Sequence, residues 1–199
     1  KHKETSLFNV LLFVPRDIKE VIVPKYIKYI DSYAFSGCSQ LERVEFEPES
    51  SLELISTESF SKSSIKSIII PKSVKKIKEK AFNSCNSLKS LQFMEDSQLE
   101  RIEENFVSLA LMKQIKIPNN AKMIKKNAFN YYTDSKTLEF LDDSEIATFE
   151  EFSFNHESIE RIYLPPKLKE ISDSIFDLYT LSEISISPQN KYFSLINDG

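Results

Sequence analysis

The sequence predicts a single elongated, mainly β solenoid, in which about eight coils of 22–24 residues stack through short parallel strands. Two observations predict this architecture. A period of 47 residues is shared by four segments of the chain, and each period divides into two similar halves with strand-like apolar spacing. A coil of this length cannot bury its apolar face alone, so the coils must stack to form a common core.

The 47-residue period is carried by proline, isoleucine and phenylalanine. Three series keep the interval throughout: Pro24, Pro71, Pro118 and Pro165; Ile30, Ile77, Ile124 and Ile171; and Phe35, Phe82, Phe129 and Phe176. Because each series takes the same place in successive coils, we expect the phenylalanines to form one column inside the core.

Each period divides into an odd unit and an even unit. The units begin near residues 18, 41, 65, 88, 112, 135, 159 and 181. Every unit opens with apolar residues at its first, fourth and sixth positions, such as Leu41, Val44 and Phe46, and this alternation is typical of a half-buried strand. We therefore expect a solenoid over residues 18–199, preceded by an N-terminal segment or partial cap at residues 1–17.

The second half of each unit predicts another strand. In odd units, proline follows the opening strand and ends it because proline has no backbone donor. Two apolar residues three apart then follow, such as Val74 and Ile77, and they predict a second, narrower parallel sheet. Short turns or 3-10 segments complete the coil, since these stretches are too short for ordinary helices.

The composition limits the function. The chain has 199 residues, of which 41% are hydrophobic, and this is enough for one sizeable core. Its net charge of −4 argues against a nucleic-acid binder. With only Gly37 and Gly199, a glycine-rich phosphate loop is excluded. The sequence contains no run of eighteen apolar residues, so no membrane span is predicted.

Catalytic, metal and disulfide sites are not expected. His2 and His156 lie at no spacing typical of a metal ligand or of an activated nucleophile, so we expect no enzyme and no cofactor. Cys38 and Cys85 lie two coils apart, roughly 10 Å, which exceeds the reach of a disulfide; we expect two free thiols in the core.

Carboxylates gather in the loops of the even units. They allow two interpretations: a calcium site, which is the more specific, and surface ion pairs. Glu47 and Glu49 are examples, and Lys72 takes the matching place in the next odd unit. These loops lack the spaced ligands and the glycine of a calcium loop. We expect weak surface ion pairs there instead, and no metal site.

The repeat is similar to a known family. Residues 64–77, followed by Ala-Phe-Asn-Ser-Cys at 81–85, resemble the BspA-type leucine-rich repeat. Residues 96–102 resemble the variant that alternates with the Ile-Pro form, and the resemblance covers roughly residues 11–199. It implies a leucine-rich-repeat solenoid with no catalytic residues, of the kind associated with cell-surface adhesion proteins.

The chain departs from this family pattern at two kinds of position. It lacks the glycine that usually follows Ile30, Ile77 and Ile124, and it has Ser135 where an apolar residue belongs. These departures affect the local regularity of the coils and not the fold.

Two columns of exposed side chains on the opening strands are the candidate partner-binding residues. The first holds four lysines about 5 Å apart, which can attract an acidic partner or simply extend into water: Lys66, Lys89, Lys113 and Lys136. The second contains apolar residues among polar ones: Ile69, Gln92, Lys116, Glu139 and Tyr163. Exposed apolar side chains are reasonable contact anchors, although single ones are normal on any surface.

Three functions fit these observations. The resemblance favours a non-catalytic binding module of a surface or secreted adhesin, with a host or extracellular-matrix protein as its partner. An intracellular scaffold or a structural spacer would use the same array. The coil that opens at Leu181 does not complete, which also allows end-to-end self-association or a continuing array.

Overall fold

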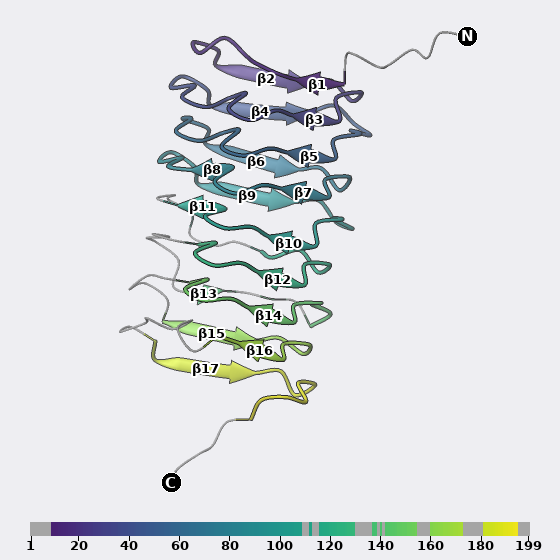
Figure 1. The fold of residues 1–199 in the computed structure, drawn as a ribbon, viewed down its shortest axis with the longest axis vertical. Coiled ribbons are helices and arrows are strands. Elements are labelled where there is room, and N and C mark those ends of the chain that lie inside the picture. The colour runs from purple at the N-terminus through teal and green to yellow at the C-terminus, as the bar shows by residue number, and fades with distance from the viewer. Residues whose placement is uncertain are drawn as a thin grey trace, which may run out of the picture.

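The computed structural model describes residues 9–108, 112, 116–129, 137–138, 140, 142–154, 160–172 and 181–194. These residues wind into a stack of coils, with β1 and β2 at one end and β17 at the other (Figure 1). They form strands and turns, with no helix among them. The mainly β solenoid predicted from the sequence is therefore confirmed.

Strands that open the coils form the wider of two faces, here called the strand face. Its first sheet contains β2 (Glu20–Val23), β4 (Arg43–Phe46), β6 (Ser67–Ile70) and β9 (Ser90–Phe93). A second sheet continues it with β13 (Thr137–Leu138), β15 (Arg161–Leu164) and β17 (Glu183–Ile186). All neighbouring strands are parallel.

Two-residue strands form the narrower sheets that the spaced apolar pairs predict. One contains β1 (Val10–Leu11), β3 (Tyr29–Ile30), β5 (Leu54–Ile55) and β7 (Lys76–Ile77). Another contains β10 (Arg101–Ile102), β12 (Met123–Ile124), β14 (Thr148–Phe149) and β16 (Glu170–Ile171). A third joins β8 (Phe82–Asn83) to β11 (Val107–Ser108) at the turn. The sheet that contains β1 therefore begins within residues 1–17, the segment predicted to precede the solenoid or to cap it.

Alternating apolar residues explain why the opening strands form. In β6, Ile68 and Ile70 are buried while Ser67 and Ile69 face the solvent. Stacking the coils removes these isoleucines from water, which stabilises each strand against its neighbours. Pro71 then ends the strand.

A column of phenylalanine rings runs through the core. Phe35 and Phe60 stack with ring centroids 4.6 Å apart, and Phe60 and Phe82 stack at 5.1 Å. The column continues through Phe106, Phe129 and Phe154. The predicted alignment of Phe35, Phe82 and Phe129 is therefore confirmed; Phe176 lies outside the described residues.

Both cysteines are buried and free. The Cys85 thiol donates to the Phe60 carbonyl at 3.1 Å, and burial raises its pKa to about 11. A thiol with this pKa stays protonated near neutral pH and is a poor nucleophile. Cys85 therefore acts in the described structure as a small core residue.

The number of coils differs from the prediction of about eight. Six coils open with a four-residue strand in the described residues, namely those of β2, β4, β6, β9, β15 and β17. The coils predicted near Met112 and Ser135 show a single bridging residue, Lys116, and the two-residue β13. Part of each of these two opening segments lies outside the described residues, so the predicted count exceeds the number of coils with a described four-residue strand.

Turn residues with positive φ account for the missing glycines. Tyr33 (φ 63°), Lys80 (φ 58°) and Asn127 (φ 54°) occupy one turn position, 47 residues apart. Even coils repeat this conformation at Glu58, Asn105 and Phe152. The turn keeps the left-handed conformation that glycine adopts without strain, and this chain fills it with side-chain-bearing residues.

Candidate protein-binding face

The predicted contact residues that the structure describes lie along the strand face. Lys66, Lys89, Ile69, Gln92 and Lys116 are exposed. Tyr163 is half-buried, and its hydroxyl lies 3.3 Å from a carboxylate oxygen of Asp142. Lys113, Lys136 and Glu139 lie outside the described residues.

The two described lysines of the first column have different surroundings. They are neighbours, because the N–H of Lys89 donates to the Lys66 carbonyl at 2.9 Å. The Lys66 ammonium lies 2.7 Å from a Glu42 carboxylate oxygen, and the hydrogen bond from Lys66 lowers the pKa of Glu42. One positive charge of the ladder is therefore paired within the chain.

Isoleucines interrupt the polar strand face at two places. The side chain of Ile22 on β2 is 64% exposed, and that of Ile69 on β6 is 55% exposed. Each occupies the fifth position of its coil, and β4 lies between their strands. Their surroundings differ because the strands on either side of β4 pair differently.

Strand β4 pairs fully with β2 and barely with β6. Four residue pairs join β2 to β4, from Glu20 with Arg43 to Val23 with Phe46. A single pair, Arg43 with Ser67, joins β4 to β6, although both strands are fully described. The next junction is complete again, because four pairs join β6 to β9. Beyond their first residues, β4 and β6 therefore diverge.

Proline explains where the sheet opens. After β4, the N–H of Glu47 donates to the Val23 carbonyl at 3.0 Å, and after β9 the N–H of Met94 donates to the Ile70 carbonyl at 3.0 Å. The equivalent donor after β6, aimed at the Phe46 carbonyl, would be residue 71. That residue is proline and has no N–H. Pro71 therefore cannot donate the hydrogen bond that would close β6 onto β4.

A groove of about 570 Å³ lies at this opened junction. It is lined by β4, the loop 47–50, the first part of β6, Pro71 and Lys72, and Met94. Ile69 and Met94, which are 55% and 49% exposed, contribute apolar surface to it. The volume is within the range of ligand-binding clefts.

The charges in the groove differ from the expected ion pairs. Arg43 is neutralised, because it lies 3.2 Å from Glu20 and 3.4 Å from Glu45. By contrast, Glu47, Glu49 and Lys72 form no ion pair with any described residue, so the predicted pairing of these loop charges is wrong. Glu47 instead accepts the backbone N–H of Lys25 at 2.9 Å.

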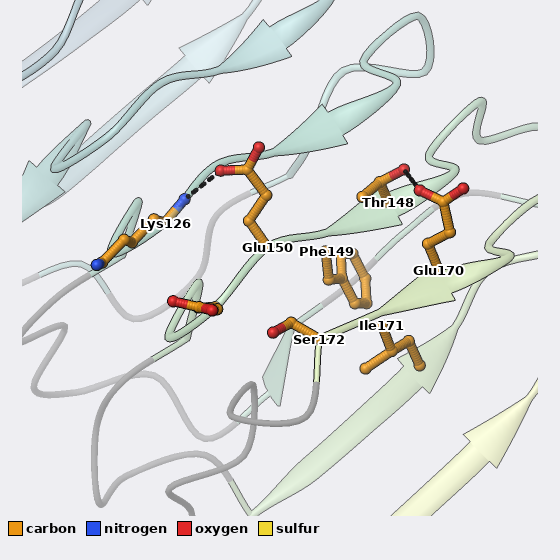
Figure 2. A pocket seen from close by; sticks show the side chains of 8 residues that line it. Lys126, Thr148, Phe149, Glu150, Glu170, Ile171 and Ser172 are labelled. Atoms are coloured by element: carbon orange, nitrogen blue, oxygen red, sulfur yellow. Dashed lines mark hydrogen bonds between the residues drawn. The ribbon is translucent and has the colours of Figure 1, made fainter.

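A second hollow of about 390 Å³ lies beside β14 and β16 (Figure 2). Part of its polar lining is engaged internally. A Glu150 carboxylate oxygen accepts the backbone N–H of Lys126 at 3.1 Å, and Thr148 donates to Glu170 at 3.0 Å.

Neither a metal-binding cluster nor a membrane-spanning helix is found in the described part of the chain. No group of three or more histidine, cysteine, aspartate or glutamate side chains there is arranged to hold a metal ion. No helix of sufficient length and apolarity to cross a bilayer occurs among the same residues.

The sequence prediction identified Ile69 but missed the groove around it. Arg43, Phe46, Glu49 and Met94 line the groove, and none belonged to the predicted set. Proline at the start of the odd-coil loops was the available signal, because it marks the junctions that lack the closing hydrogen bond.

Comparison with protein families gives one match. The family model described as "BspA type Leucine rich repeat region" matches residues 11–131 and 100–195, in six copies. Together these ranges cover nearly the whole chain. Comparison with curated proteins gives no match.

Solved structures of similar fold come from bacteria. The pneumococcal vaccine antigen PcpA aligns with a TM-score of 0.65 at 22% identity, over 86% of this chain and 51% of PcpA. A leucine-rich repeat protein from Bacteroides ovatus aligns with a TM-score of 0.58 at 19% identity, over 88% of this chain and 62% of that protein. This chain thus spans about half to three fifths of these structures.

Proposed function

Because the chain belongs to the BspA-type leucine-rich-repeat family, we propose that it is a non-catalytic protein-binding module of a surface or secreted adhesin-like protein. The exposed strand face is the proposed binding surface, with a host or extracellular-matrix protein as the proposed partner. The observation that carries this proposal is the strand face itself, where exposed isoleucines stand among charged side chains. Exposed apolar anchors surrounded by polar groups are typical of protein interfaces.

Support for a location outside the cell comes from one structural neighbour. PcpA is a pneumococcal vaccine antigen, and its fold is similar to that of this chain. The repeat architecture also suits the role, since stacked coils create extended surfaces with room for a protein partner.

The predicted contact residues remain proposals within this function. We propose contacts from Lys66, Lys89, Ile69, Gln92, Lys116 and Tyr163. Their side chains come from several coils, so a partner would contact the face along the stacking axis. Lysines with no internal partner would favour an acidic surface on that partner.

A binding screen tests the proposal. The immobilised chain would be exposed to extracellular-matrix and host-surface proteins, and any partner would be titrated by surface plasmon resonance. The double variant Ile69→Asp and Gln92→Glu should weaken binding by about tenfold or more, because it removes an apolar anchor and adds two negative charges opposite an acidic partner. Lys76→Glu, on the exposed part of β7 in the narrower sheet, is the matched control and should change little.

Two results would contradict the proposal. If Lys76→Glu weakens binding as much as the strand-face variant, another surface binds the partner. If no partner binds at concentrations up to about 100 μM, which is weaker than a typical specific interface, the array acts as a spacer.

End-to-end self-association is a separate proposal. The outer edges of β2 and β17 stand at the ends of their sheets in the described residues, and exposed strand edges can pair with another copy. Light scattering should then show a mass that rises with concentration, whereas a constant monomer mass would contradict it.

A further inference from the structure

The opened junction between β4 and β6 has unpaired backbone on both sides. The Ile70 carbonyl accepts a hydrogen bond from the coil of β9, so alternation along the strand turns the backbone of Ile69 toward β4. Across from it, β4 has no paired residue after Arg43. Two facing strand edges with free donors and acceptors are the feature that an extended peptide recognises.

The groove also offers apolar surface that an occupant can bury. Ile69 and Met94 are about half exposed, and the half-buried ring of Phe46 lies against the core beside them. Ile22, at the equivalent position of the closed junction, is as exposed as Ile69 but does not line the groove. An aliphatic side chain in the groove would therefore gain contacts that the rest of the strand face does not provide.

The carboxylates that line the groove determine which charge a bound peptide should carry. Arg43 is already paired with Glu20 and Glu45. Glu47 and Glu49 remain against the single ammonium of Lys72, and none of the three has an ion-pair partner among the described residues. The free charge in the groove is thus negative, and it complements lysine or arginine.

We infer that the β4–β6 groove binds an extended peptide segment of a partner protein in which an aliphatic residue has a lysine or arginine two positions away on each side, so that the three side chains lie on one face of the peptide. The aliphatic side chain contacts Ile69 and Met94, the basic side chains reach Glu47 and Glu49, and the peptide backbone pairs with the open strand edges. This inference rests on the proposed protein-binding function and adds the site and the chemistry of the partner.

The probe, here called the lysine–valine peptide, is an acetylated and amidated heptapeptide that carries a fluorophore; it has a central valine, a lysine two residues away on each side, and serine elsewhere. Fluorescence anisotropy would measure its affinity for the full chain. NMR chemical shifts would locate it, and the expected shifts lie at Phe46, Ile69 and Met94. A peptide with glutamate in place of each lysine should bind at least about tenfold more weakly, because its charges oppose those of the groove.

Matched variants separate the groove from the strand face as a whole. Ile69→Ser should weaken binding of the lysine–valine peptide by about tenfold or more, since it removes the apolar contact without adding a charge. Ile22→Ser makes the same change at a similarly exposed site outside the groove and should leave affinity within about twofold. Glu49→Lys should weaken binding and reduce its dependence on salt.

Three outcomes would overturn the inference: no binding of the lysine–valine peptide at millimolar concentration, equal binding of the glutamate peptide, or equal effects of Ile69→Ser and Ile22→Ser. The proposed function is tested separately from the groove. If a protein partner found by the screen loses affinity with Gln92→Glu but not with Ile69→Ser, the strand face binds that partner and the groove inference is wrong.

Discussion

The two junctions on either side of β4 have the same core and different sheets. Toward β2, four residue pairs join the strands; toward β6, one pair does. Behind both junctions the phenylalanine column is unbroken, with Phe60 stacked on Phe35 and on Phe82. Around β4 the coils are therefore joined continuously through the core but unevenly through the strand face, because Pro71 removes the donor that would close β6 onto β4.

The largest expected effect concerns the phenylalanine column, through which the coils are joined continuously. Phe60→Ala should lower the free energy of unfolding by about 3–5 kcal/mol, because it leaves a cavity between two stacked rings. Phe46→Ala, which removes a half-buried ring at the opened junction, should cost about half as much or less. Urea denaturation of both variants measures the difference. Similar losses would mean that the core does not dominate the joining of the coils.

Glycine at the left-handed turn positions should have a smaller effect of opposite sign. Lys80 in an odd coil and Glu58 in an even coil both have positive φ, 58° and 51°. Lys80→Gly and Glu58→Gly should each raise the free energy of unfolding by up to about 1 kcal/mol, because glycine relieves backbone strain. Thermal denaturation would show it. Markedly unequal changes in stability for the two variants would mean that the turns of odd and even coils also differ.

Pro71→Ala should close the opened junction with little change in stability. The new N–H can donate to the Phe46 carbonyl, but alanine also gives the unfolded chain more freedom, so the net change should stay within about 1 kcal/mol. The lysine–valine peptide should bind more weakly as the groove narrows. Pro24→Ala, after β2, is the control and should leave the peptide affinity unchanged. If Pro71→Ala binds the lysine–valine peptide with unchanged affinity, Pro71 is not the cause of the groove.

The smallest effect concerns the ion pair that crosses the opened junction. Lys66 holds the pKa of Glu42 below its usual value, so the stabilisation is present above that value and is lost as pH falls through the lowered pKa. Lys66→Met should return the pKa of Glu42 toward its ordinary range in an NMR titration, whereas Lys89→Met should not. Both carboxylate and ammonium are exposed, so stability should change little. An unmoved Glu42 titration in Lys66→Met would show that the pair does not form in solution.

The repeat in the sequence was enough to predict the solenoid, the parallel strands and the aligned phenylalanines. These features follow from local alternation and a fixed period, which every coil repeats. The strand register was also predictable, because Ile22 pairs with Glu45, and Ile69 with Gln92, as the shared fifth position requires.

The groove and the charge pairing were not predictable in the same way. Pro71 marks the junction that lacks the closing hydrogen bond, but residue spacing shows neither how far β4 and β6 diverge nor which side chains line the groove. Periodicity also places Lys66 in a lysine column without showing that its ammonium turns back to Glu42. The predicted count of eight coils exceeds the six that open with a four-residue strand in the described residues.

Hydrogen exchange at single amides tests the uneven joining of the coils around β4 and β6 most directly. The Ile70 N–H belongs to the closed β6–β9 junction, while the Ile69 N–H faces the opened junction. We predict that the amides of Ile69 and Phe46 exchange about tenfold or more faster than those of Ile68 and Ile70, which matches the loss of one hydrogen bond. Equal protection of these neighbouring amides would show that the sheet is continuous through β4 and β6 and would contradict the account.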